Sequence, residues 1–150
     1  FKKHFKIEGD QIIQMSNFVG FMLDESVKRG FKNVIVGGHP GKLTKLIRGD
    51  FYTHSSESEP ANDILINLFK KAEIDSAVIC ELEESPTVEG MVEIMGKHNR
   101  LDIFNSVADD VQEAAYRYVS SKTEIGTIMF DMKKNIVGTS KGFKIWQKRL

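Results

Sequence analysis

The side chains best suited to chemistry lie in one glycine-rich stretch, residues 37–55, which reads GGHPGKLTKLIRGDFYTHS. It contains two histidines, His39 and His54, whose imidazoles exchange protons near neutral pH. It also contains three cationic side chains, Lys42, Lys45 and Arg48, which can bind carboxylates or phosphates. This combination predicts a binding site for an anionic ligand, with a candidate general base beside it.

The stretch follows an apolar, β-branched run at residues 33–36, which is typical of a strand buried on both faces of a parallel sheet. Glycines at the carboxyl end of such a strand let a ligand approach the backbone closely. The next helix would present free N–H groups and the positive end of its dipole to the same crevice. We therefore expect ligand binding at this strand-to-helix turn.

Two familiar phosphate motifs fail against this stretch. A P-loop needs a glycine where this chain has Val36 and a serine or threonine where it has Leu43. A dinucleotide fingerprint that ended at Gly41 would need glycines at Val36 and Gly38, and only Gly38 is present. ATP hydrolysis and ordinary NAD binding therefore lose most of their support.

The stretch resembles the signature of the cobalt-precorrin-5B C1-methyltransferase family (CbiD) of anaerobic cobalamin synthesis. A Gly-His-x-Gly-Lys-Leu-x-Lys run, a later glycine and a Thr-His-Ser end are present, at Gly38, His39, Gly41, Lys42, Leu43, Lys45, Gly49, Thr53, His54 and Ser55. The upstream segments 17–20 (NFVG) and 30–32 (GFK) also resemble the family. The sequence departs from the family pattern at Pro40, at Tyr52, where the family has asparagine, and over residues 56–63.

The resemblance implies an S-adenosylmethionine-dependent methyltransferase that acts at C1 of cobalt-precorrin-5B. It implies that the turn at 38–42 binds either the cofactor or a carboxylate of the substrate, and we assign it to the cofactor, at Gly38, His39, Gly41 and Lys42. Binding of the corrinoid substrate would involve Asn17, Lys42, Lys45, Thr53 and Ser55. Methyl transfer from a sulfonium is a direct displacement, so the one side-chain role to fill is a base, for which His54 comes first and His39 second. No metal site is expected, because no cysteine or carboxylate completes a zinc ligand set at a recognisable spacing.

Plainer interpretations remain open. The glycine turn could be a simple connection, the lysines and Arg48 could form a solvated helix face, and the histidines could be structural. The chain could also be a non-catalytic module that binds a tetrapyrrole or a nucleotide within a larger protein. A third alternative is an unrelated nucleotide-binding α/β enzyme.

The elements that must position these residues indicate an α/β fold, with a parallel sheet flanked by helices as in a Rossmann-like C-terminal domain, a mainly helical middle and a C-terminal strand pair. We expect strands at 11–15, 33–36, 125–132 and 135–139. We expect a helix capped by Ser16 or Asn17 and ended by Gly30, and a second, short one closed by Gly49. Further helices are expected at 61–72, 75–82, 87–97 and 103–121, although 74–80 could equally be a buried strand.

Composition limits the function classes. The chain has 150 residues, 41% of them hydrophobic, which is enough for one domain with its own core. Lysines plus arginines equal aspartates plus glutamates at 21 each, so no overall field favours nucleic acid or an anionic membrane. A lone cysteine, Cys80, suits the cytoplasm and is expected to be a small buried hydrophobe, and Met132 is expected to serve packing.

No apolar run is long enough to span a bilayer, and an oligomer is compatible with the sequence. The first residue is Phe1, so we expect residues 1–150 to be a single α/β domain from the C-terminal part of a longer protein whose N-terminal region is missing.

Overall fold

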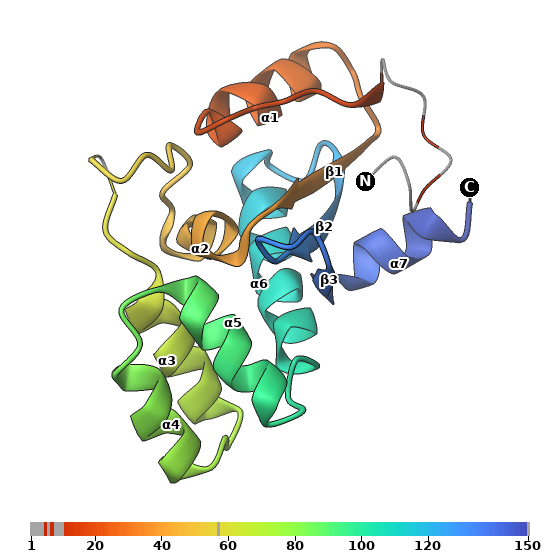
Figure 1. The fold of residues 1–150 in the computed structure, drawn as a ribbon. Coiled ribbons are helices and arrows are strands. Elements are labelled where there is room, and N and C mark those ends of the chain that lie inside the picture. The colour runs from red at the N-terminus through yellow and green to blue at the C-terminus, as the bar shows by residue number, and fades with distance from the viewer. Residues whose placement is uncertain (1–4, 6, 8–10, 57, 150) are drawn as a thin grey trace.

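Strands and helices alternate in the first third of the chain, helices fill its middle, and two strands and a helix end it (Figure 1). The computed structural model describes residues 5, 7, 11–56 and 58–149. In chain order its elements are α1 (Val19–Lys28), β1 (Asn33–Gly38), α2 (Pro40–Leu43), the 3-10 helix η2 (Thr44–Arg48), α3 (Asn62–Lys71), α4 (Ser76–Glu83), α5 (Val88–Lys97), α6 (Ile103–Tyr118), β2 (Glu124–Phe130), β3 (Ile136–Thr139) and α7 (Lys141–Gln147).

The three strands form one mixed sheet in the order β1-β2-β3. β1 and β2 run parallel, with Val36 opposite Thr127, whereas β3 runs antiparallel to β2. The α/β class is confirmed, but the expected Rossmann-like parallel sheet is not, because only β1 and β2 run parallel. The chain between β1 and β2 contains several helices and can make a parallel crossover, whereas the short turn at 131–135 can join only antiparallel strands.

The middle strand β2 is covered on both faces. Its side chains alternate, so Ile125 and Met129 enter the main core beneath α6, while Ile128 packs with Phe143 of α7 on the other face. Helices α6 and α7 therefore enclose the sheet as two outer layers.

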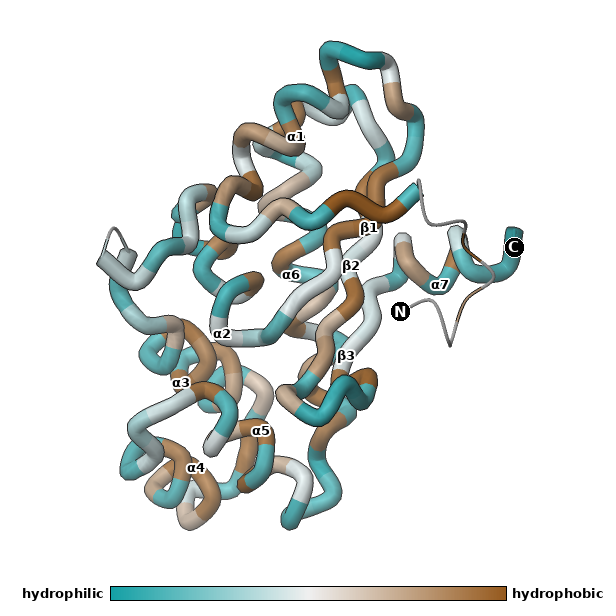
Figure 2. Tube along the Cα trace, turned by 45° about the horizontal axis from the view of Figure 1, so that its top comes forward, coloured by the Kyte–Doolittle hydropathy of each residue, from teal (hydrophilic) through white to brown (hydrophobic). Residues whose placement is uncertain are grey.

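Helices α3, α4 and α5 lie together at the end of the molecule opposite α1 (Figure 1). Hydrophobic stretches alternate with hydrophilic ones along these helices in Figure 2, as expected of helices with one buried side. Phe69 of α3 meets Phe104 of α6 edge-on, with ring centroids 5.7 Å apart. Buried side chains of α3, α4 and α5 belong to the same cluster as those of α6, β1 and β2, so the helical middle shares the core of the sheet.

Most of the expected elements are confirmed. The helices at 61–72, 75–82 and 87–97 differ from α3, α4 and α5 by a few end residues, and α6 ends at Tyr118 rather than at residue 121. The ambiguous run 74–80 lies mainly in a helix, and its start is capped by Asp75, whose carboxylate accepts the Ala77 N–H. Gly30 and Gly49 have positive φ angles of 73° and 95°, as their helix-ending role requires.

Four expectations are wrong. Residues 11–15 form no strand, since a strand needs the backbone of a neighbouring strand and Ile13 is 65% exposed. Neither Ser16 nor Asn17 caps α1, because the N-cap residue is Phe18 and has no side-chain cap. Cys80 is exposed rather than buried, and Met132, expected to serve packing, is 72% exposed. In addition, α7 forms in a segment for which no element is expected from the sequence.

Within the described part of the chain, no helix has the length and apolar character needed to cross a membrane.

Candidate functional site

The turn that follows β1 is held together by His39. Its backbone is extended, it caps the start of α2, and its ring Nδ1 accepts the Gly41 N–H at 3.1 Å. The Lys42 and Leu43 N–H groups donate to the His39 carbonyl oxygen, and Pro40 has no N–H. The expectation that the start of this helix presents free N–H groups is therefore wrong, because His39 already accepts them.

Close packing leaves little room for a side chain at Gly38 and Gly41. A Cβ atom on Gly41 would lie 3.2 Å from His39 Nδ1 and 3.4 Å from Val88 Cβ, and one on Gly38 would lie 3.3 Å from the Leu43 side chain. Neither glycine has a positive φ angle. Small residues therefore let His39 and α5 approach the turn.

The second ring nitrogen of His39 connects the turn to α5 and to the strand pair. His39 Nε2 lies 2.6 Å from Glu89 Oε2, and Glu89 Oε1 accepts the Met132 N–H at 3.2 Å. Since Nδ1 accepts a backbone N–H, the single ring proton lies on Nε2 and is donated to Glu89. Both ring nitrogens of His39 are engaged in this arrangement.

Two of the motif segments lie side by side as a short antiparallel pair. Phe18 and Tyr52 form a bridge, flanked by hydrogen bonds from Gly20 N–H to the Phe51 carbonyl and from Thr53 N–H to the Asn17 carbonyl. The Asn17 side chain does not cap α1 but accepts the Lys42 ammonium at 2.9 Å. Residues 17–20, 38–45 and 51–55, which are separate in the sequence, therefore meet.

Lys45 is buried, in contrast to the solvated helix face that its spacing suggested. It is 6% exposed, and its Nζ donates to Ser58 Oγ at 2.8 Å, to the Ser58 carbonyl at 3.2 Å and to the Thr53 carbonyl at 3.5 Å. Helical spacing could not show this, because the covering atoms belong to the loop that follows Thr53. Lys45 thus fastens that loop to η2.

His54 lies in this loop and is exposed. Its Nδ1 is 2.7 Å from Ser56 Oγ and accepts the Ser56 N–H at 3.2 Å. No bond to its Nε2 is present among the described residues, so this nitrogen faces solvent. Its ring lies nearly parallel to that of Tyr52, with centroids 6.4 Å apart.

A cleft of about 460 Å³ lies between the turn, the loop and the start of α5. Five of the residues predicted from the sequence line it: His39, Gly41, Lys42, Lys45 and Ser55. The predicted residues Asn17, Gly38, Thr53 and His54 are not in its lining. The remaining lining residues are Ser58, Pro60, Ala61, Asn62, Pro86, Thr87, Val88, Glu89 and Met132. Its size is in the range of small-molecule sites, and its walls combine apolar surface with a few polar groups.

The most informative of the lining residues that the sequence did not indicate is Glu89. The Thr87 hydroxyl caps α5 by accepting the Gly90 N–H, which places Glu89 in the first turn of the helix. A cap of this kind can be recognised in a sequence. That Glu89 meets His39, 50 residues away, cannot be recognised there.

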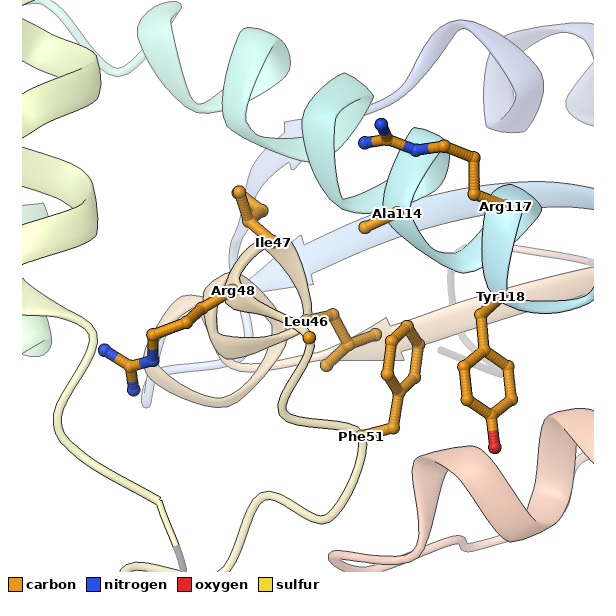
Figure 3. A pocket seen from close by; sticks show the side chains of 8 residues that line it. Leu46, Ile47, Arg48, Phe51, Ala114, Arg117 and Tyr118 are labelled. Atoms are coloured by element: carbon orange, nitrogen blue, oxygen red, sulfur yellow. The ribbon is translucent and has the colours of Figure 1, made fainter.

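A second hollow, of about 300 Å³, lies between η2 and α6, and of the cationic candidates in the glycine-rich stretch it contains only Arg48 (Figure 3). Phe51 and Tyr118 stack there with centroids 4.0 Å apart, and Arg48 and Arg117 point away from the stacked rings. Burial and the hydrogen bond to Asp24 raise the pKa of Tyr118 above its usual value, so it stays neutral near pH 7. Arg48 pairs with Asp50, and Arg117 lies near Glu113, so this hollow offers less for a charged ligand than the cleft does.

Residues 52–141, more than half of the chain, match the model of the CbiD C-terminal domain. The chain belongs to the CbiD family. Family members that it resembles are the cobalt-precorrin-5B C(1)-methyltransferases of Methanococcus maripaludis (38% identical), Methanococcus aeolicus (34%) and Photorhabdus laumondii (29%).

These alignments cover 92–93% of this chain but only 36–39% of each CbiD relative. No solved structure matches the chain. The family match includes Thr53, His54 and Ser55, whereas the turn at His39 precedes it.

Proposed function

We propose that the protein to which this chain belongs methylates C1 of cobalt-precorrin-5B with S-adenosylmethionine, as the names of its relatives indicate for them. The observation that carries the proposal is that the three motif segments contact one another beside a cleft, which residues of 38–45 and 51–55 line, in a chain of the CbiD family. The same observation favours binding of both reactants by this part of the protein, since a methyl transfer needs donor and acceptor side by side.

The residues of the cleft fit the methyl donor. Pro86, Val88 and Met132 offer apolar surface for a nucleoside, and the exposed Lys42 ammonium can bind a carboxylate. S-adenosylmethionine supplies an electrophilic methyl group when it is bound. The protein then has to orient the donor and to exclude water. Orientation of the reactants can lower the activation barrier by ~7–11 kcal/mol.

We assign the substrate to the adjoining rim. Phe18 and Tyr52 are 51% and 40% exposed, their ring centroids are 5.1 Å apart, and Asn17 connects them to Lys42. Aromatic rings beside an ammonium suit a large ring that carries carboxylates. Lys45 and Thr53 contribute to substrate binding indirectly, because the Lys45 ammonium holds the loop that follows Thr53. Ser55, in that loop, lines the cleft.

We propose His54 as the base that removes a proton from the corrinoid, and His39 as a positioning residue. In the structure Nδ1 of His54 accepts the Ser56 N–H, which leaves the ring proton on Nε2. For Nε2 to accept a proton, Nδ1 must exchange that bond for the ring proton and donate it to Ser56 Oγ, which lies 2.7 Å away. His39 has no free ring nitrogen in this arrangement, so its role is to hold the turn.

The test uses the complete enzyme, cobalt-precorrin-5B and S-adenosylmethionine labelled in its methyl group. We expect label in the corrin ring, and its absence would refute the proposed function. His54→Gln should lower turnover about 100-fold or more, with little change in donor affinity. His98→Gln is the matched control, because His98 is exposed, pairs with Glu81 and is not in the cleft lining.

An equal loss of turnover and donor affinity in His54→Gln would instead make His54 a binding residue. Tyr52→Ala should raise the KM for the corrinoid and leave donor affinity unchanged. Phe31→Ala, which removes another exposed aromatic ring, should change neither.

A further inference from the structure

The cleft contains a charged group for which the proposed reaction has so far no role, the carboxylate of Glu89. Among the described residues that line the cleft it is the only acidic one. Both of its oxygens are held, Oε2 by the His39 ring and Oε1 by the Met132 N–H, and its side chain is 26% exposed. The carboxylate therefore has a fixed orientation in the wall of the cleft.

The negative charge of Glu89 is not neutralised by its partners. His39 Nδ1 accepts the Gly41 N–H, so it is unprotonated and the ring is neutral. The other partner is a backbone amide. No lysine or arginine in the described ranges lies within ion-pair distance of Glu89. A carboxylate that is largely shielded from water and faces only neutral donors attracts a cation more strongly than an exposed one does.

The two ammonium groups of the cleft, like the Glu89 carboxylate, are hydrogen-bonded to neutral groups. Lys42 donates to the side-chain oxygen of Asn17, and Lys45 donates to carbonyl and hydroxyl oxygens. Neither ammonium contacts a carboxylate among the residues that the structure describes. The cleft thus contains both signs of charge, each bound only to neutral groups within the described residues, which suits a ligand that itself has a cationic and an anionic group.

We propose that Glu89 recognises the cationic end of the methyl donor, with Lys42 facing the donor's carboxylate. The inference rests on the proposed function, and it names the residue that selects a charged donor over an uncharged thioether. The cation is either the ammonium or the sulfonium of the donor, and the experiment separates the two.

The experiment measures binding to the 150-residue chain by calorimetry. The probes are S-adenosylmethionine and 5′-methylthioadenosine, an uncharged thioether with the same nucleoside. Glu89→Gln should weaken S-adenosylmethionine binding about tenfold to a hundredfold and change 5′-methylthioadenosine binding less than about twofold. Glu93→Gln, one turn further along α5 and not in the cleft lining, should change neither. Glu89→Asp keeps the charge and should retain most of the preference for S-adenosylmethionine.

S-adenosylhomocysteine, which keeps the ammonium and lacks the sulfonium, separates the two cations. If Glu89→Gln weakens it as much as S-adenosylmethionine, Glu89 faces the ammonium, and if its affinity is unchanged, Glu89 faces the sulfonium. Equal weakening of S-adenosylmethionine and 5′-methylthioadenosine, or no weakening of either, would overturn the inference.

A wild-type chain that does not bind S-adenosylmethionine would overturn both the inference and the placement of the donor in this cleft. Transfer of label by the complete enzyme is measured independently, so the proposed function would survive that result.

Discussion

At the scale of single residues, the polar side chains of the glycine-rich stretch bind largely to the protein's own backbone. His39 accepts the Gly41 N–H, and Lys45 donates to the Thr53 and Ser58 carbonyls. Side chains that the sequence suggests as ligand contacts are thus partly used to build the walls of the site. Such supporting bonds fix a binding geometry, because a loop without them would sample many conformations.

The role of Lys45 can be tested with Lys45→Met, which keeps a long side chain and removes the ammonium. We expect a loss of about 1–3 kcal/mol in the free energy of unfolding, because two carbonyls and a hydroxyl lose their donor. Hydrogen exchange of the Ser58 amide, which donates to the His54 carbonyl, should also become faster. Lys42→Met is the control, with an expected loss below about 0.5 kcal/mol, since Lys42 is exposed. Equal losses in the two variants would contradict the clamping role.

At the scale of elements, glycines allow the outer helices to lie very close to the sheet. A Cβ atom on Gly138 of β3 would lie 2.4 Å from the Phe104 carbonyl oxygen of α6, and one on Gly142 would lie 2.4 Å from the Ile125 carbonyl oxygen. Such distances are shorter than van der Waals contact, and backbone atoms cannot rotate away as side chains can. These glycines set the spacing between α6, α7 and the sheet.

Gly138→Ala should therefore lower the free energy of unfolding by at least about 1–3 kcal/mol, the usual cost of overpacking. Gly96→Ala is the matched control, because it lies inside α5 and its Cβ would meet only Leu101, at 3.9 Å. Alanine favours a helix over glycine, so this variant should gain about 0.5–1 kcal/mol. Chemical denaturation of both variants measures the difference, and a neutral Gly138→Ala would mean that α6 can shift away from β3 at little cost.

At the scale of the whole molecule, one main core connects the helical end to the sheet. Buried residues of α1, β1, β2, β3 and the helices α3 to α6 belong to a single cluster, and a smaller one lies between β2 and α7 around Phe143. The chain's single tryptophan, Trp146, packs against the smaller cluster. From this arrangement we expect the described residues to unfold together, as one domain.

Phe69→Ala tests that expectation, because Phe69 lies in the helical part and Trp146 reports on the opposite side of the sheet. We expect a loss of about 3–5 kcal/mol, with far-UV circular dichroism and Trp146 fluorescence shifting together in one transition. Phe31→Ala changes a side chain that is 52% exposed, so it should leave the unfolding transition unchanged in both signals. Two separate transitions would show that α3, α4 and α5 unfold independently.

The sequence by itself determined the local structure and the family. Apolar spacing located α3, α4, α5 and the strand pair, and Gly30 and Gly49 marked the ends of α1 and η2, since each of these signals acts between residues close in the chain. The motif residues also predicted a common site, and five of them, His39, Gly41, Lys42, Lys45 and Ser55, line one cleft.

Only the tertiary structure decided which groups face one another. Three features join residues that are separate in sequence: the contact of Glu89 with His39, the burial of Lys45 beneath Thr53 and Ser58, and the mixed sheet. The run at 11–15 failed as a strand for the same reason, since its apolar pattern does not state whether a partner backbone is present. Periodicity records which side of an element is apolar, whereas the fold determines what covers that side.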